Sequence, residues 1–268
     1  MQIAATSMAL LGLLLFLLQV AAREIGYRLG RRHAERRNAN AESVGVIVGG
    51  MLGLLAFVLA LTLSFNNQRY EERRAGALAE ANAIGTAWLR AYTVGHPRGP
   101  EIARLVEEYA ALRTEFVRAP ATSTALDAMA TRSGALQAAI WGQMAGIAEE
   151  RRDAMAESLQ RALNDAFDLG AAERYAFNFP MPAEYFWLLL GLTAVSMGAV
   201  GYQLGLRGTP LHALSLALIG MWTLVMLVIV DLGTARLGRF QTSTEPYEWT
   251  LQGFQGGVVV PPMAPAAR

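Results

Sequence analysis

The sequence predicts an all-α polytopic membrane protein, with four transmembrane helices and a helical extramembrane domain between helices 2 and 3. Of its 268 residues, 53% are hydrophobic and only 17% are charged, whereas soluble domains carry about 25% charged residues. The shortage of charge is confined to four uncharged runs, which are residues 1–22, 43–68, 185–206 and 208–230. The long segment between the second and third runs is instead charged and has helical periodicity.

Each uncharged run is long enough to cross a bilayer. A helix rises about 1.5 Å per residue, so about 20 residues cross a hydrocarbon core of about 30 Å. Backbone N–H and C=O groups must be paired within a segment that lies in lipid, and this favours helices. The expected transmembrane helices are residues 3–22, 44–65, 185–206 and 211–230.

The first run could instead be a cleaved signal peptide, because Val20-Ala21-Ala22 would be an acceptable cleavage site. No basic residue precedes its apolar stretch, however, so we expect it to remain as the first helix. The chain then divides into a transmembrane hairpin, an extramembrane helical domain, a second hairpin and a C-terminal tail. These parts are residues 1–65, 66–183, 184–231 and 232–268.

Three helical patterns fill the predicted extramembrane domain. No helix breaker follows the second transmembrane run until residues 96–100, so this helix is expected to continue as one long helix. A second pattern covers residues 102–116, and a third covers residues 136–167. Arg151 and Arg152 interrupt the apolar face of the third pattern, where we expect a bend or a change of packing partner.

The distribution of arginine leaves the orientation in the membrane open. Loops rich in basic residues usually stay in the cytoplasm, which would place the arginine-rich loop after the first helix there and the large domain outside. Arg69, Arg73 and Arg74 follow the second helix and nearly balance this bias.

The sequence shows no signature of an enzyme. The chain has no cysteine, and its three histidines, His33, His96 and His212, do not have the spacing of metal ligands. There is no nucleophile elbow, Walker loop or dinucleotide-binding glycine motif. We therefore predict a protein that is not an enzyme and has no metal, cofactor or nucleic-acid partner. Its expected partner is the lipid bilayer.

Small residues recur along two of the predicted transmembrane helices. Gly45, Gly49 and Gly53 are four residues apart on the second helix, and Gly191, Gly198 and Gly205 are seven apart on the third, with Gly201 nearby. Small residues let helix backbones approach closely in lipid, so these positions are predicted to pack against other helices.

Three large apolar residues, Phe57, Leu61 and Phe65, are also four residues apart on the second helix. Residues at this spacing are offset by about 40°, so the three share one face. In an oligomer around an axis they would form an apolar constriction of the kind that gates pores by excluding water. The alternative is that they face lipid or a neighbouring helix. No ionised residue lies at mid-depth in any span, which argues against an ion-coupled transporter.

Two segments resemble the hallmark of a bacterial bestrophin-like membrane family of unknown function. They are Arg69-Tyr70-Glu71-Glu72-Arg73-Arg74 and Glu80-Ala81-Asn82-Ala83-Ile84-Gly85-Thr86-Ala87-Trp88-Leu89-Arg90. The resemblance extends over nearly the whole chain and includes Phe167-Asp168-Leu169 and Asp231-Leu232. The family-motif positions are Arg74, Glu80, Asn82, Arg90 and Asp231.

This resemblance implies a relation to bestrophins, which are pentameric anion channels whose second helix lines a pore with an apolar neck. It implies a homo-oligomer in the bacterial inner membrane that conducts small anions, with Phe57, Leu61 and Phe65 at the neck. The acidic calcium clasp of animal bestrophins has no counterpart in the sequence. Bestrophins place the large domain in the cytoplasm, against the arginine distribution. The alternative function is a non-conducting membrane scaffold or sensor that acts through its helical extramembrane domain.

Overall fold

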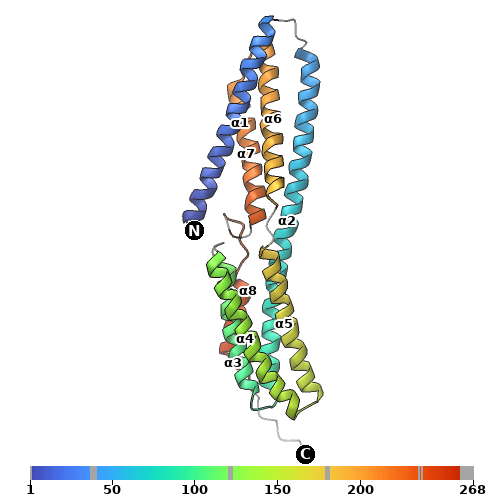
Figure 1. The fold of residues 1–268 in the computed structure, drawn as a ribbon, viewed down its shortest axis with the longest axis vertical. Helices are drawn as coiled ribbons and strands as arrows, with labels where there is room; N and C mark the ends of the chain where they lie inside the picture. The colour runs from blue at the N-terminus through green and yellow to red at the C-terminus, as the bar shows by residue number, and fades with distance from the viewer. Residues whose placement is uncertain are drawn as a thin grey trace, which may run out of the picture. The chain divides into compact units, whose positions relative to one another are not determined.

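The computed structural model of the chain describes residues 2–36, 41–119, 123–178, 182–234, 236 and 238–259. These residues contain helices and no strand, which confirms the predicted all-α class (Figure 1). In order, the helices are α1 (Gln2–Arg36), α2 (Ala41–Thr93), α3 (Gly99–Arg118), α4 (Ser123–Glu150), α5 (Ala154–Asn178), α6 (Ala183–Arg207), α7 (His212–Thr234) and α8 (Glu245–Gln255).

The chain forms two compact units, and α2 contributes to both. Unit 1 comprises Met1–Glu71 and Phe179–Gln241, and unit 2 comprises Glu72–Asn178 and Thr242–Arg268. The predicted boundary of the extramembrane domain at residue 66 therefore lies a few residues before the start of unit 2.

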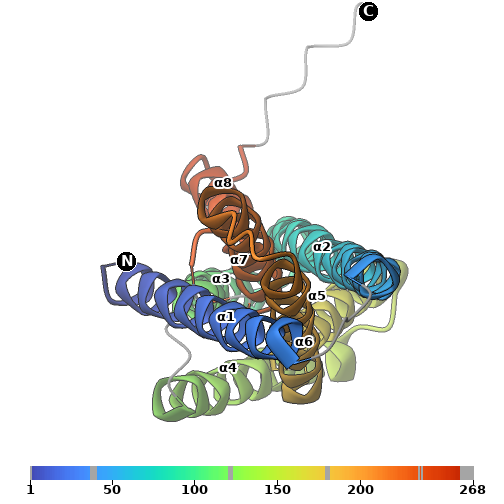
Figure 2. The ribbon, with the colours of Figure 1, turned by 90° about the horizontal axis from the view of Figure 1, so that it is seen from above.

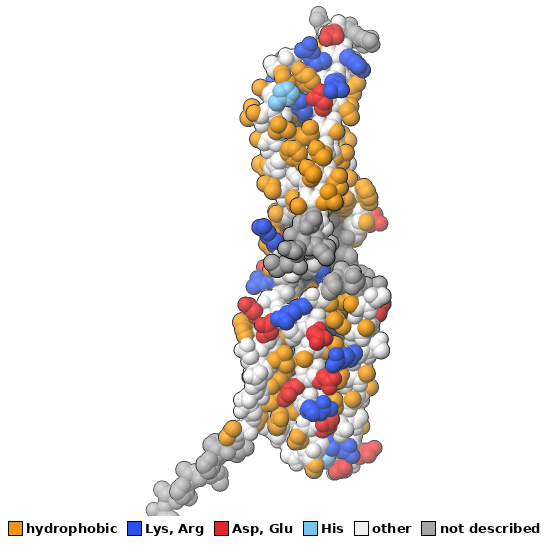
Figure 3. All heavy atoms as spheres, turned by 90° about the vertical axis from the view of Figure 1, so that its left-hand side faces the viewer, with side chains coloured by type: hydrophobic (Ala, Val, Ile, Leu, Met, Phe, Trp, Pro, Cys, Tyr) orange, Lys and Arg blue, Asp and Glu red, His pale blue; other side chains and the backbone are white. Residues whose placement is uncertain are grey.

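Four stretches of the described chain are long and apolar enough to span a membrane. They are Ser7–Glu35, Glu42–Thr93, Ala154–Arg207 and His212–Thr234, and each overlaps one predicted transmembrane range. Figure 3 shows hydrophobic side chains over the middle of unit 1, with charged side chains gathered at one end, whereas both signs of charge are scattered over unit 2. The chain is therefore a membrane protein with four spans, one each in α1, α2, α6 and α7.

The long α2 helix confirms the prediction that the second span continues without a break, since it extends over 53 residues to Thr93. The α1 helix also continues beyond its predicted end at Ala22, as far as Arg36. The turn between α6 and α7 is closed by Gly208, which has a φ of 68° and donates its N–H to the Gly205 carbonyl over 3.1 Å. Glycine at this position adopts the left-handed conformation without steric cost.

Unit 1 is held together by a close packing of α1 on α6, seen side by side in Figures 1 and 2. A Cβ atom on Gly26 would lie 2.8 Å from the carbonyl carbon of Gly198, and one on Gly201 would lie 2.8 Å from the carbonyl carbon of Arg23. The two backbones therefore touch. Gly30 and Gly205 make similarly close approaches one turn further along.

Apolar side chains from four helices fill the interior of unit 1. The buried members of this core are Leu15, Leu55, Leu59, Leu189, Met197, Ile219, Met226 and Ile229. Two polar side chains lie among them with partners, since Gln19 donates to the Thr223 hydroxyl over 2.9 Å and Asn66 donates to the Ile229 carbonyl over 3.3 Å. The side-chain N–H groups of these two residues therefore have the hydrogen bonds that buried donors need.

Unit 2 is a bundle of α3, α4, α5, α8 and the C-terminal part of α2. The predicted apolar face of α3 is buried in it, including Ile102, Tyr109 and Phe116. The third predicted pattern is two helices, because α4 ends at Glu150 and α5 begins at Ala154. Asp153 lies in the break between the two helices. Its carboxylate accepts the N–H groups of Met155 and Ala156, both over 3.0 Å, and so caps α5.

The predicted C-terminal tail contains a helix that the sequence analysis did not identify. Within residues 232–268, α8 packs in unit 2 with Tyr247 fully buried. The Phe254 ring stacks on Trp88 of α2, with ring centroids 4.7 Å apart. The α8 helix is therefore part of the bundle.

Candidate functional site

The three predicted pore-lining residues lie on one exposed face of α2. Phe57, Leu61 and Phe65 have exposed fractions of 61%, 56% and 50% within the single chain. The opposite face of the same stretch is buried against unit 1 through Leu55 and Leu59. We call Phe57, Leu61 and Phe65 the neck residues.

The exposed face covers about half of the circumference of α2. With 100° between successive residues, its exposed positions gather around the direction of Phe57. They are Val46, Ile47, Gly49, Gly50, Gly53, Leu54, Ala56, Phe57, Ala60, Leu61, Ser64, Phe65, Asn67 and Gln68. Within one chain this half of the helix is left for lipid or for another subunit.

The predicted packing glycines fall into two groups. Gly45 faces the Gln203 side chain of α6, and a Cβ on Gly198 would contact the Ala22 carbonyl at 3.5 Å. A Cβ on Gly49, Gly53 or Gly191 would meet nothing within 4 Å in the described chain. The closest helix contact in unit 1, between α1 and α6, uses Gly201 and Gly205, which belong to the predicted glycine pattern of the third span. On the α1 side it uses Gly26 and Gly30, which were not predicted to pack. The spacing of four residues between Gly26 and Gly30 on α1 could have identified them as packing positions from the sequence.

A buried ion pair lies at the centre of unit 2 and uses the family-motif residue Glu80. Arg113 of α3 binds this carboxylate with both ends of its guanidinium, with Nε to Oε1 at 2.5 Å and Nη2 to Oε2 at 3.0 Å. The Tyr247 hydroxyl of α8 donates to the same carboxylate over 2.5 Å. Glu80 and Arg113 are almost fully buried. A buried pair is stable only with such geometry and extra hydrogen bonds.

A second buried carboxyl, Glu173 of α5, lies near this pair and was not identified from the sequence. It packs against α2 at Gly76, where a Cβ atom would lie 2.9 Å from the carboxyl carbon of Glu173. The Arg113 guanidinium is already occupied, since it also donates to the Gly170 carbonyl over 3.3 Å. Unit 2 thus holds two buried carboxyl groups within the electrostatic reach of one another.

The other family-motif residues have separate surroundings. Arg90 ties α2 to α5 through a 2.7 Å hydrogen bond to the Ser158 carbonyl. Arg74 is exposed, and Asn82 is exposed at the edge of a shallow groove that is floored by Trp88 and Phe254. The structure brings Glu80, Asn82 and Arg90 onto α2 in unit 2 but not into one site.

Asp231 ends the membrane part of α7 and organises the chain that follows. Its buried carboxylate accepts the N–H of Arg239, at 3.1 and 3.0 Å to its two oxygens, and the N–H of Phe240 at 3.3 Å. Gly238 has a φ of 89° and packs directly on this carboxylate, which leaves no room for a Cβ atom. Asp231 therefore stabilises the turn that follows α7.

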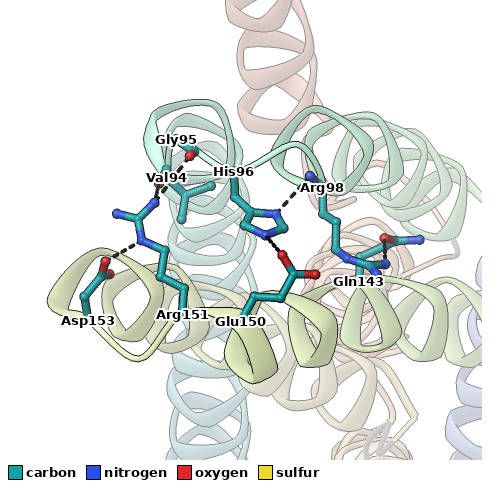
Figure 4. Close-up of polar contacts among 8 residues, drawn as sticks. All are labelled: Val94, Gly95, His96, Arg98, Gln143, Glu150, Arg151 and Asp153. Atoms are coloured by element: carbon teal, nitrogen blue, oxygen red, sulfur yellow. Dashed lines mark hydrogen bonds and ion pairs between the residues drawn. The ribbon is translucent and has the colours of Figure 1, made fainter.

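A polar cluster joins the α2–α3 turn to the α4–α5 turn in unit 2 (Figure 4). His96 Nδ1 accepts the Arg98 backbone N–H over 3.1 Å, so Nε2 carries the proton and donates to Glu150 over 3.0 Å. Arg151 donates to the Val94 carbonyl over 2.6 Å. These contacts fix the two turns to each other, and the residues described include no cluster of three or more potential metal ligands.

No family model and no curated protein matches this sequence. Solved structures do resemble it. The chain is similar to a bacterial bestrophin homologue from Klebsiella pneumoniae, with a TM-score of 0.63 and 16% identity over 92% of this chain and 98% of that one. A point variant of that homologue gives a TM-score of 0.63 and 15% identity, over 93% and 99% of the two chains. The chain therefore has a bestrophin-like fold, which confirms the predicted resemblance at the level of the fold.

Proposed function

We propose that this protein is a homo-oligomeric ion channel of the bacterial inner membrane, in which α2 lines an apolar neck and small anions pass. The exposed half of α2 around Phe57 is the observation that carries the proposal. The bestrophin-like fold supports it. By analogy with bestrophins, we propose five subunits around the axis.

The neck residues have the geometry that a hydrophobic constriction needs. Positions four apart rise by about 6 Å, so the three side chains would form successive rings over about 12 Å of a pore axis. Rings of large apolar side chains exclude water from a narrow pore and so oppose ion passage until the pore widens. On the side of the neck that is nearer the N-terminus, Gly50 and Gly53 provide two positions without a side chain on the same face, between Val46 and Leu54.

A positive charge beside the neck favours anions. The Arg69 guanidinium lies 5.2 Å from the centroid of the Phe65 ring, one turn beyond the last neck residue. Repeated in each subunit, this arrangement would place a ring of guanidinium groups at that mouth of the neck. Charged rings select ions of the opposite sign in other pores.

The experiment compares two leucine substitutions in protein reconstituted into planar bilayers. Leu61→Ala removes one neck ring and should raise the unitary conductance or the open fraction several-fold. Leu214→Ala is the matched control, because Leu214 is 68% exposed on α7 and is not a neck residue. It should leave the currents unchanged.

Arg69→Gln provides a second readout, since it should lower the permeability of chloride relative to sodium. Bilayers that stay silent in several salts and at all voltages would refute the channel proposal. So would a particle image without an axial opening, and either result would favour the scaffold or sensor alternative.

A further inference from the structure

The carboxyl group of Glu173 is buried, and one of its oxygens has no hydrogen-bond partner in the described structure. Its exposed fraction is 3%, and the oxygen concerned is Oε2. Glu173 lies in unit 2, on α5, and outside the four uncharged runs that span the membrane. An ionised carboxylate in such a place loses its hydration, and its Oε2 atom gains no hydrogen bond in exchange.

The charged and titratable groups around Glu173 come from three other helices. From α2 come Arg73 and Glu80, from α3 Arg113, and from α8 Tyr247. Arg113 and Tyr247 are both committed to the Glu80 carboxylate through hydrogen bonds. The hydrogen bonds from α3 and α8 therefore stabilise the Glu80 carboxylate. Glu173 instead experiences the negative charge of Glu80.

These surroundings favour the neutral form of Glu173. Burial is the main cause, and together with the charge of Glu80 it raises the pKa of Glu173 to about 8, against the opposing effect of Arg113 and Arg73. Burial and then Glu80 also raise the pKa of Tyr247, so this hydroxyl keeps its proton at neutral pH. Glu173 is the group in this cluster that exchanges a proton near physiological pH.

We propose that Glu173 is a proton-binding site that controls the packing of α5 on α2 in unit 2. With the proton bound, a neutral carboxyl lies against the α2 backbone at Gly76. When the proton leaves, a second carboxylate stands beside Glu80 in the interior and repels it. The contact between α5 and α2 then loosens.

The stability of the protein should report this proton. The folded state binds the proton more tightly than the unfolded chain, where the ordinary pKa is 4.5. The stabilisation that the bound proton provides is therefore fully present below that ordinary value. It is lost as the pH rises through the folded-state pKa of about 8, and above this pH the contribution no longer changes.

The first experiment measures thermal unfolding of the full-length protein in detergent from about pH 5 to about pH 9.5. The melting temperature of the wild type should fall by several degrees over this range, whereas Glu173→Gln should show no such fall and should melt higher than the wild type at alkaline pH. Asp165→Asn is the control, because Asp165 is an exposed carboxylate on the same helix. It should behave as the wild type.

Infrared difference spectroscopy on the wild type tests the site without depending on a variant. A protonated-carboxyl C=O band should disappear with a midpoint near pH 8, and it should be missing in Glu173→Gln. If no such band titrates in the wild type, or if it persists in the variant, the proposal is wrong.

A third readout rests on the proposed channel function. Because α2 also carries the neck residues, conduction should depend on pH in the wild type and lose this dependence in Glu173→Gln. Absence of any current would overturn the channel proposal alone, since the infrared and thermal results would still decide whether Glu173 binds the proton. Currents that keep their pH dependence in the variant would count against the proton site.

Discussion

The touching backbones of α1 and α6 make a substitution at Gly201 informative. In Gly201→Ala the new Cβ would lie 2.8 Å from the carbonyl carbon of Arg23 and closer still to its oxygen. Ordinary van der Waals contact begins at 3.4 Å, so relief of the contact with the carbon alone requires a separation of about 0.6 Å, and the closer oxygen requires more. Overpacking of this kind costs about 1–3 kcal/mol.

The expected loss must be separated from the effect of alanine on the helix itself. Alanine is favoured over glycine in a helix by about 1 kcal/mol. Gly220→Ala on α7 is the matched control, because a Cβ there meets nothing within 4 Å in the described chain. The two variants should therefore differ by about 1–3 kcal/mol in the free energy of unfolding, with Gly201→Ala the less stable.

Denaturant unfolding in detergent, followed by tryptophan fluorescence, measures this difference. Equal stability of the two variants would show that the α1 and α6 backbones do not meet at Gly201. A large loss in the control alone would instead place the important contact at Gly220, possible only if another subunit packs there.

Two further substitutions test the polar contacts. Arg113→Met leaves the Glu80 carboxylate buried without its cation and should lower the free energy of unfolding by about 3–5 kcal/mol, measured with denaturant. Adding Glu80→Gln should recover part of this loss. A double variant that recovers none of it would contradict the ion-pair reasoning. Gly238→Ala forces a side chain onto a φ of 89° and against the Asp231 carboxylate, so the melting temperature should fall, with a cost of about 1–2 kcal/mol from the backbone alone; an unchanged melting temperature would refute the tight turn.

The general fold could be predicted because it follows from long-range patterns of charge. The four spans follow from stretches without an ionised side chain, and the length of α2 follows from the lack of a breaker before residue 96. The break between α4 and α5 was not predicted as two helices. The helical spacing of apolar residues continues across the break. Only the capping of α5 by Asp153 shows that a new helix begins there.

The α8 helix was missed although its signals were present. Pro246 stands in the first turn, and Tyr247 and Phe254 have helical spacing, but the segment is short and lies within the predicted C-terminal tail. The partners of Glu80 could not have been predicted, because Arg113 and Tyr247 meet it only through the packing of three helices. Spacing alone also did not reveal which glycines face a neighbour, as the contrast between Gly191 and Gly201 shows.

The glycine contact between α1 and α6 also limits how unit 1 can move. Main-chain atoms of the two helices interlock over successive turns, from Gly26 with Gly198 to Gly30 with Gly205, so sliding one along the other would drive carbonyl groups into each other. We expect the pair to shift as a single rigid piece. In the channel that we propose, any change in the width of the neck would then come from tilting or rotating α2, or from new rotamers of its own aromatic side chains.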